Sequence, residues 1–239
     1  MFEQGDGKVS DHPCYLSVCA IIKDEAQYIK EWIEFHRIVG VEKFFIYDNG
    51  SSDDLKDVLA PYIREKIVSY QYWPEHPGQI SAYVDCIKNF KDQSRWVAFI
   101  DADEFLFCSQ SGDLRVMLRE YEKCPGVCVN WVCFGSSGHR HKPEGLVVEN
   151  FIRRAQLGWK TNRHVKSIVQ LSEVLSPALN PHSFVYRNGR LAVTETGREI
   201  VPDFENLNGG MSQEVSIGKF RINHYMCKSF EEAQRKVNR

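Results

Sequence analysis

The sequence has 239 residues, of which 30 are Lys or Arg and 32 are Asp or Glu, so its formal net charge is −2. This balance provides no overall attraction to nucleic acid or to an anionic membrane, so we expect no nucleic-acid partner and expect any anionic ligand to be held by local groups. The length suits one α/β domain with a covered core. The sequence contains no apolar run of about 18 residues, so it predicts no transmembrane segment.

The first half of the sequence predicts a largely parallel sheet. Strand-like and helix-like segments alternate from residue 16 to residue 107, as in consecutive βαβ units. The fourth strand is apolar on both faces, as expected of a central parallel strand. The predicted strands are 16–22, 43–48, 66–73 and 96–100.

Three helices are predicted between these strands, because apolar side chains recur at every third or fourth position. Asp24 would cap the first helix and Gly40 would end it, while the third helix would begin near Gln79. The apolar positions are Ile29, Trp32, Ile33, His36 and Val39 in the first helix, Leu55, Val58, Leu59 and Tyr62 in the second, and Ile80, Tyr83, Val84 and Ile87 in the third.

The pattern changes after residue 107. One helix is indicated by Leu114, Met117, Leu118 and Tyr121, a strand is indicated over 126–134, and short strands with Gly- and Asn-rich turns follow. This half predicts a mixed sheet. The absence of internal repeats and linkers in the sequence favours a single domain. The final stretch, "SFEEAQRKVNR", begins a helix without a capping glycine, so we expect the chain to be part of a longer protein.

The eight cysteines predict free thiols more than disulfides. Several lie within apolar runs, where a thiol packs as a small hydrophobic group, which favours a reducing compartment and a cytoplasmic location. Membrane association through residues outside this sequence stays open. A zinc site is disfavoured because the set has no CxxC pair and two of its cysteines lie in a strand pattern. That set is Cys124, Cys128, Cys133, His139 and His141.

Ligands of open α/β sheets bind at the carboxyl ends of the strands, so the residues there carry the functional information. The first strand is followed by "KDEA" rather than G-x-G-x-x-G, and no Walker A sequence occurs, which excludes the usual NAD, FAD and P-loop sites. Asp48 ends the second strand, where its carboxylate suits a ribose hydroxyl or a base N–H. Residues 49–53 favour an Asx-turn or a helix cap.

The fourth strand runs into the acids Asp101, Asp103 and Glu104. If the strand persists, Asp101 and Asp103 project to one side about 6 to 7 Å apart, which suits Mg²⁺ or Mn²⁺ bound to a diphosphate. A buried strand that ends in three acids is costly if it forms only a turn. Haloacid-dehalogenase-like phosphohydrolases also use D-x-D, but after their first strand and before Thr or Val, which makes that alternative weaker here.

Five ordered stretches together resemble glycosyltransferase family 92 and the related family 2-like proteins. They are "CAIIKDEAQYIKEWIEFHRIVGVEKFFIYDNGSSDD", "QISAYVDCIKNF", "WVAFIDADEFLF", "NWVCFGSSGH" and "INHYMCKSFEEAQRK". The resemblance covers about residues 16 to 238. Asp24 departs from it, because relatives usually carry Asn there.

The resemblance implies an α/β GT-A fold with a mostly parallel central sheet and a mixed C-terminal half. We expect one domain over 1–239, with about 16–107 binding the nucleotide and about 108–239 facing the acceptor. Asp101 and Asp103 would hold Mn²⁺ or Mg²⁺ against the diphosphate of a nucleotide sugar, and His224 would reach the metal. Asp48 would contact the nucleoside.

Three further residues are candidates for nucleotide-sugar binding. Lys228 would offer a charge to phosphate, Lys23 stands at the end of the first strand near the expected diphosphate, and Gln79 would address the base. Trp131 would stack on a sugar or, as we favour, pack in the core, and the role of Lys166 is open. No general base is assigned among the candidates Glu144, Glu149, Asp203, Glu205 and His139.

The sequence therefore predicts a metal-dependent glycosyltransferase. It would move a sugar from a nucleoside-diphosphate sugar, with UDP favoured, to a glycan or other hydroxyl acceptor, with inversion. Two alternatives are a catalytically silent sugar-nucleotide-binding protein and, with less support, a D-x-D phosphohydrolase.

Overall fold

The computed structural model describes residues 12–202 and 210–237. The strands of its first half are β1 (Cys14–Ile22), β2 (Lys43–Asp48), β3 (Val68–Tyr72), β4 (Ser94–Phe99) and β5 (Glu104–Cys108). The later strands are β6 (Gly126–Cys133), β7 (Val165–Gln170), β8 (Val174–Pro177), β9 (Phe184–Tyr186), β10 (Ala192–Thr194), β11 (Glu199–Ile200) and β12 (Phe220–His224). The helices are α1 (Ala26–Ile38), α2 (Leu55–Arg64), α3 (Gln79–Phe90), α4 (Leu114–Leu118), α5 (Val147–Asn150) and α6 (Phe230–Val237).

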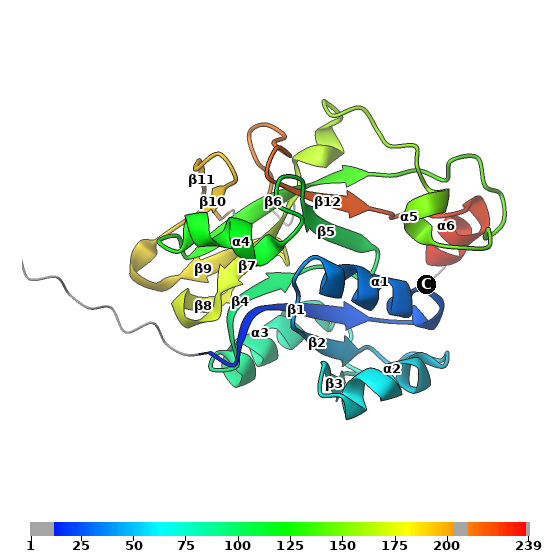
Figure 1. Ribbon diagram of the computed structural model, residues 1–239, viewed down its shortest axis with the longest axis horizontal. Helices are drawn as coiled ribbons and strands as arrows, with labels where there is room; N and C mark the ends of the chain where they lie inside the picture. The colour runs from blue at the N-terminus through cyan, green and yellow to red at the C-terminus, as the bar shows by residue number, and fades with distance from the viewer. Residues whose placement is uncertain (1–11, 203–209, 238–239) are drawn as a thin grey trace, which may run out of the picture.

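One ten-stranded sheet runs through the described chain (Figure 1). Its main order is β11-β10-β6-β7-β4-β1-β2-β3, and β12 joins β5 to β6. Strands β3, β2, β1 and β4 are parallel, whereas β7 is antiparallel to both β4 and β6. The predicted fold class, an α/β domain with a mostly parallel sheet and a mixed C-terminal half, is confirmed.

The surroundings of β4 differ from the prediction of a parallel strand on both sides. Its neighbour β1 is parallel, but its other neighbour, β7, is antiparallel. The reason is that a short turn leads from β4 directly into β5, with no crossover helix to return the chain for another parallel strand.

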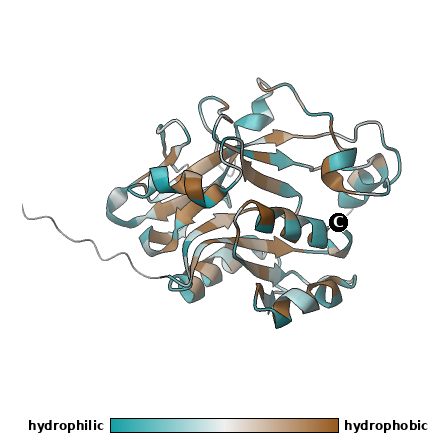
Figure 2. Cartoon of the chain, in the orientation of Figure 1, coloured by the Kyte–Doolittle hydropathy of each residue, from teal (hydrophilic) through white to brown (hydrophobic). Residues whose placement is uncertain are grey.

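The helices cover both faces of the sheet. Helices α1 and α2 pack with Leu16 and Phe44 on one face, and α3 packs with Phe45 and Phe99 on the other. Figure 2 shows apolar residues along the strands and hydrophilic residues on the outer sides of the helices. The parallel sheet is thus buried on both faces, which explains why its strands are continuous apolar runs.

The predicted apolar face of α3 is partly wrong. Tyr83 and Ile87 are buried as expected, but Ile80 and Val84 are 36% and 45% exposed. The face that meets the sheet is instead completed by Ala82, Cys86 and Phe90. Phe90 stacks on Phe45 with 4.1 Å between ring centroids, so this pairing rotates the helix away from the predicted stripe.

The ends of α1 show one correction and one confirmation. Asp24 does not cap the helix, because its carboxylate accepts hydrogen bonds from the Ser52 backbone N–H at 2.7 Å and from the Ser52 hydroxyl at 3.0 Å. The Ala26 N–H donates to Asp53 across the loop at 2.9 Å. Gly40 follows the helix with φ +104°, and a Cβ there would lie 2.4 Å from Asp113, so glycine is required.

All eight cysteines lie in the described part of the chain, and none forms a disulfide. Within that part, no helix is long and apolar enough to span a bilayer.

Candidate functional site

A cavity of about 530 Å³ opens where the carboxyl ends of β1, β2 and β4 meet the start of α3. This is the edge of the sheet at which an α/β fold binds its ligand. We call it the strand-end pocket. Its polar and charged lining residues are Lys23, Glu25, Asn49, His76, Gln79, Asp101, Asp103, His224 and Lys236.

Five of the seven predicted site residues line this pocket, and two do not. Lys23, Gln79, Asp101, Asp103 and His224 line it. Asp48 and Lys228 lie outside the lining.

Asp48 is only 4% exposed, and its carboxylate is engaged within the protein. It accepts hydrogen bonds from the Tyr70 hydroxyl at 2.6 Å and from the Ser51 N–H at 2.8 Å. The second bond spans three residues and closes the start of the loop. An Asx-turn of the kind expected for residues 49–53 forms at Asp53, whose Oδ1 accepts a hydrogen bond from the Leu55 N–H at 3.2 Å. Contact between Asp48 and a nucleoside stays a prediction.

The D-x-D segment forms a turn instead of continuing the strand. Strand β4 ends at Phe99, and β5 begins at Glu104. The Glu104 N–H donates to the Asp101 carbonyl at 3.0 Å, and the Asp101 N–H donates to the Glu104 carboxylate at 2.9 Å. The third acid of the run is therefore the group that closes the turn.

Burial governs the ionisation of Glu104. Its side chain is 0% exposed, and this burial raises the pKa of Glu104 to about 7 against the lowering influence of Lys166. The desolvation of the carboxylate outweighs its nearest cation.

Asp101 is fixed from inside the molecule. Its Oδ2 accepts a hydrogen bond from Lys166 Nζ at 2.7 Å, and its Oδ1 accepts one from Gln79 Nε2 at 3.0 Å. Lys166 is 1% exposed and also lies 3.4 Å from Glu104 Oε2. Burial acts to lower the pKa of Lys166, but the two carboxylates outweigh it and hold this pKa above its usual value. Lys166, whose role the sequence left open, thus lies between both acids and offsets part of their charge.

Asp103 lies between two cationic groups. Its Oδ1 is 3.5 Å from His224 Nε2, and its Oδ2 is contacted by the ammonium group of Lys236. Burial acts to raise the pKa of Asp103, but His224 and Lys236 hold it well below its usual value. Burial likewise acts to lower the pKa of His224, but Asp103 raises it to about 10.

Strand pairing places His224 beside the turn. In the register of β12, His224 lies opposite Glu104 of β5 and Cys133 of β6. Its ring packs against Trp131 with 4.5 Å between centroids. Trp131 itself is 7% exposed and donates from Nε1 to the Thr161 carbonyl at 2.7 Å, which supports the core interpretation of this residue.

The chemistry of Asp103 and His224 fits a divalent cation. Carboxylate and neutral imidazole are ligands that Mn²⁺ accepts, so His224 would bind a cation after losing the proton that Asp103 stabilises. The ammonium group on Asp103 shows that a cation is already stable at this carboxylate. Within residues 12–202 and 210–237, however, no three His, Cys, Asp or Glu side chains gather as a ready-made metal site. A cation here would take its other ligands from water and phosphate. Within the same residues, Cys124, Cys128, Cys133, His139 and His141 form no such group either.

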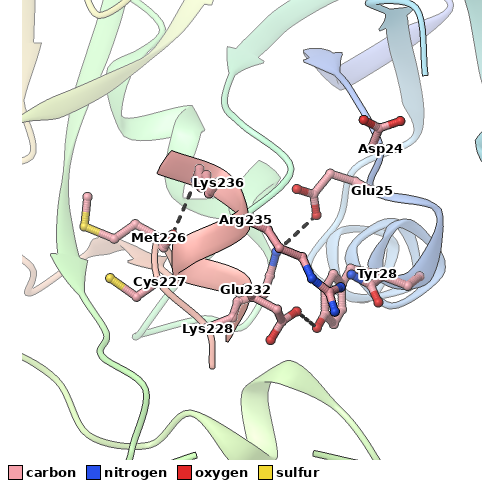
Figure 3. Close-up of a pocket in the computed structure, with 10 residues that line it drawn as sticks. Asp24, Glu25, Tyr28, Met226, Cys227, Lys228, Glu232, Arg235 and Lys236 are labelled. Atoms are coloured by element: carbon pink, nitrogen blue, oxygen red, sulfur yellow. Dashed lines mark hydrogen bonds and ion pairs between the residues drawn. The ribbon is translucent and has the colours of Figure 1, made fainter. Parts of the chain in front are cut away.

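Lys228 lies in a second, smaller pocket between the start of α1 and α6 (Figure 3). Its ammonium group is 3.1 Å from Glu25 Oε2 and 4.2 Å from the centroid of the Tyr28 ring. The two pockets share Glu25, Met226 and Lys236, so Lys228 is adjacent to the strand-end pocket but engaged with α1. A direct phosphate contact by Lys228 stays a prediction.

Several residues that line the strand-end pocket carry little or no signal in the local sequence. Lys236 contacts Asp103 from 133 positions away, and nothing in its local sequence indicates this. His76 belongs to a loop without a motif. Asn49 was interpreted as a turn residue, and its side chain does hold the loop, donating to the Trp73 and Glu75 carbonyls at 2.7 Å each. Its strand-end position was the available signal.

The general base stays unassigned. His139, Glu144 and Glu149 do not line the strand-end pocket. Asp203 and Glu205 lie outside the described residues.

Comparison with known proteins gives a consistent set of relatives. The chain is 30% identical over 189 residues to a glycosyltransferase family 92 protein of Ricinus communis, covering 77% of this chain and 34% of that protein. It is 29% identical over 220 residues to a family 92 protein of Oryza sativa subsp. japonica, covering 90% and 34%. A galactan beta-1,4-galactosyltransferase of Arabidopsis thaliana is 26% identical over 106 residues, covering 40% and 21%.

Among solved structures, the chain resembles S. aureus TarS in complex with UDP-GlcNAc, with TM-score 0.47, 13% identity, and coverage of 87% of this chain and 58% of that one. The chain spans about a third of the length of the family 92 proteins named above. The model of glycosyltransferase family 92 matches residues 12–225. The chain therefore belongs to glycosyltransferase family 92, and its α/β sheet has the mixed, largely parallel form expected from that resemblance.

Proposed function

We propose that this chain binds a nucleoside-diphosphate sugar in the strand-end pocket and transfers its sugar to a hydroxyl group of a glycan. The observation that carries the proposal is the convergence of Asp101, Asp103 and His224 on one pocket at the carboxyl ends of the parallel strands. Family membership supports the reaction class. The galactosyltransferase relative supports a hexose, and with it a UDP-sugar, as the first donor to test.

Asp103 and His224 would hold Mn²⁺ or Mg²⁺ at the edge of this pocket. The bound cation would neutralise the negative charge that develops on the departing diphosphate. Asp101 would act mainly by holding the turn in place, because both of its oxygens are engaged by Lys166 and Gln79. The burial of Asp103 and Glu104 holds the backbone of the turn in place before the donor arrives.

The other predicted residues would bind the rest of the donor. Lys23 lines the pocket beside Glu25, where a point charge suits a phosphate oxygen. Gln79 lies at the first position of α3 and donates to Asp101, so a base that binds beside it would be positioned relative to the turn. Transfer with inversion would need a base to accept the proton of the acceptor hydroxyl.

The experiment is a screen of UDP-, GDP- and dTDP-sugars for donor turnover, with and without EDTA. Wild-type chain, Asp103→Ala and the exposed-helix control Asp57→Ala would be compared. We expect turnover with a UDP-sugar, its loss in EDTA, a loss of about 10²-fold or more in Asp103→Ala, and no change in the control. Full transfer by Asp103→Ala or in EDTA contradicts the metal mechanism.

A UDP-binding assay and a phosphate-release assay with simple phosphomonoesters, added to this screen, distinguish the two alternatives. A silent binding protein would bind UDP but turn over no donor with any acceptor. A phosphohydrolase would release inorganic phosphate from simple phosphomonoesters and form a covalent aspartyl phosphate at Asp101.

A further inference from the structure

Lys236 is a cation that already occupies the carboxylate proposed for the metal. It lies on α6, its ammonium group contacts Asp103 Oδ2, and it also lies 3.4 Å from the Met226 carbonyl. Its side chain is 53% exposed, whereas that of Asp103 is 8% exposed. Lys236 lines both the strand-end pocket and the smaller pocket beside it.

We propose that Lys236 is a diphosphate-binding residue that rests on Asp103 until a divalent cation displaces it. The inference depends on the proposed function, because it assigns a residue to the donor's diphosphate. In this exchange the metal takes the carboxylate, and the ammonium group transfers to a phosphate oxygen of the same donor. No covalent bond changes.

The exposure of the lysines at this site supports an exchange at Lys236 in particular. Lys166 is 1% exposed and enclosed between two carboxylates, so its ammonium group has no path to solvent. The side chain of Lys228 is 8% exposed and is held by Glu25 and the Tyr28 ring. Lys236 has the same type of partner but a half-exposed stem with four rotatable bonds, so it can leave Asp103 at little cost.

Electrostatics supplies the reason for the movement. Asp103 alone carries one negative charge, and His224 already lies 3.5 Å from its Oδ1. A divalent cation at this carboxylate would repel a neighbouring ammonium group, and this repulsion is strong in a partly buried site. A diphosphate in the strand-end pocket offers new oxygens to which the displaced ammonium group can donate.

The helix itself is anchored, so the exchange needs only a side-chain movement. The Tyr225 N–H donates to the Asp103 carbonyl at 2.8 Å. Glu232 accepts from the Ser229 N–H at 3.0 Å and from the Tyr28 hydroxyl, which ties the first turn of α6 to α1 (Figure 3). The backbone of α6 thus stays beside the pocket whichever anion Lys236 contacts.

The test measures binding, which is independent of turnover. Mn²⁺ affinity is measured by electron paramagnetic resonance without nucleotide, and affinities for UDP and uridine are measured by calorimetry in saturating Mn²⁺. The variants are Lys236→Met and Lys236→Arg. The matched control is Lys219→Met, which removes a lysine paired with Glu120 at 2.6 Å outside the pocket. Thermal unfolding of each variant verifies that it is folded.

We expect Lys236→Met to bind Mn²⁺ about five- to tenfold more tightly and UDP about tenfold more weakly, with uridine affinity unchanged. Lys236→Arg and the control Lys219→Met should both bind Mn²⁺, UDP and uridine with affinities close to those of the wild-type chain. Unchanged Mn²⁺ affinity in Lys236→Met overturns the exchange. Tighter Mn²⁺ binding with unchanged UDP affinity overturns the diphosphate contact.

Failure of the proposed function would look different. Wild-type chain would then bind no UDP in saturating Mn²⁺, which also removes the diphosphate contact. The Mn²⁺ comparison between wild type and Lys236→Met would still decide whether Lys236 and a divalent cation compete for Asp103.

Discussion

The two aspartates of one turn are held by lysines of opposite character. Asp101 is bound from inside the sheet by Lys166, which is 1% exposed, and Asp103 is bound from the outside by Lys236, which is 53% exposed. Both contacts are carboxylate–ammonium pairs on side chains two residues apart. The enclosed Lys166 therefore belongs to the packed interior of the fold, whereas the exposed Lys236 can be replaced on its carboxylate by a ligand.

The largest expected effect is on the inner pair. Lys166→Met would leave the fully buried Glu104 and the partly exposed Asp101 without their cation, so we expect a loss of about 3 kcal/mol in the free energy of unfolding. Denaturant unfolding at pH 7 measures it. A loss below about 1 kcal/mol would show that the inner pair is no more structural than a surface pair.

The stability of the protein interior should also decrease in acid, because His36 is buried there as a neutral ring. This buried imidazole lies 2.7 Å from the Trp32 carbonyl through Nδ1, and its Nε2 accepts the Leu106 N–H of β5 at 3.1 Å. The neutral Nδ1–H tautomer satisfies both partners, so protonation would remove the bond to the strand that follows the turn. Burial lowers the pKa of His36 to about 4 despite the bond to Trp32.

The folded-state pKa of His36 lies below the usual 6.5, so the unfolded chain takes up the proton first as pH falls. Its contribution to stability is present above pH 6.5 and decreases toward pH 4, by about 3 kcal/mol in total. Denaturant unfolding from pH 7 to pH 4.5, with NMR titration of the His36 ring, measures this. A ring that titrates near its usual pKa would refute the prediction.

The next expected effect is on metal binding, where replacing Asp103 and replacing Asp101 should lower the Mn²⁺ affinity by different factors. Asp103→Asn should weaken Mn²⁺ binding about tenfold or more, whereas Asp101→Asn should weaken it about threefold, since Asp101 is directed toward Lys166 and Gln79. Mn²⁺ titration of both folded variants gives the ratio. A larger effect for Asp101→Asn would reverse the assignment of inner and outer roles.

The smallest expected effect is the loss of protein stability when the outer lysine, Lys236, is replaced. Lys236→Met should change the free energy of unfolding by about 1 kcal/mol or less, because its side chain is half exposed. The denaturant experiment used for Lys166→Met measures both variants under identical conditions. Equal losses in the two variants would remove the distinction between the pairs.

The regular half of the fold was predictable from sequence. The predicted strand 43–48 coincides with β2, and α1 buries the residues expected of its apolar stripe, since each pattern reports a face that packs on the sheet. Helix α2 buries Leu55, Leu59 and Tyr62, while Val58 is only partly buried. The stripe of α3 was less informative. Ile80 and Val84 share the helical period with Tyr83 and Ile87, and only the ring partners of the sheet decide which face is buried.

The candidate site was predictable only in part. Lys23, Asp101 and Asp103 were predicted from their positions just after strands, because parallel strands bring their carboxyl ends together and ligands bind there. It gave no information on the partners of the aspartates. Phe99 of β4 lies opposite Ser167 of β7, and this antiparallel register brings Lys166 to the turn. Lys236 arrives from α6, so its contact depends on tertiary packing that no local pattern contains.

The most direct test of the strand-end pocket is a crystal structure of the chain with Mn²⁺ and UDP, with anomalous scattering used to locate manganese. We expect an anomalous peak within bonding distance of Asp103 and His224, with the diphosphate beside it and the nucleoside toward Gln79. Manganese bound elsewhere, with nothing between Asp103 and the start of α3, would contradict it.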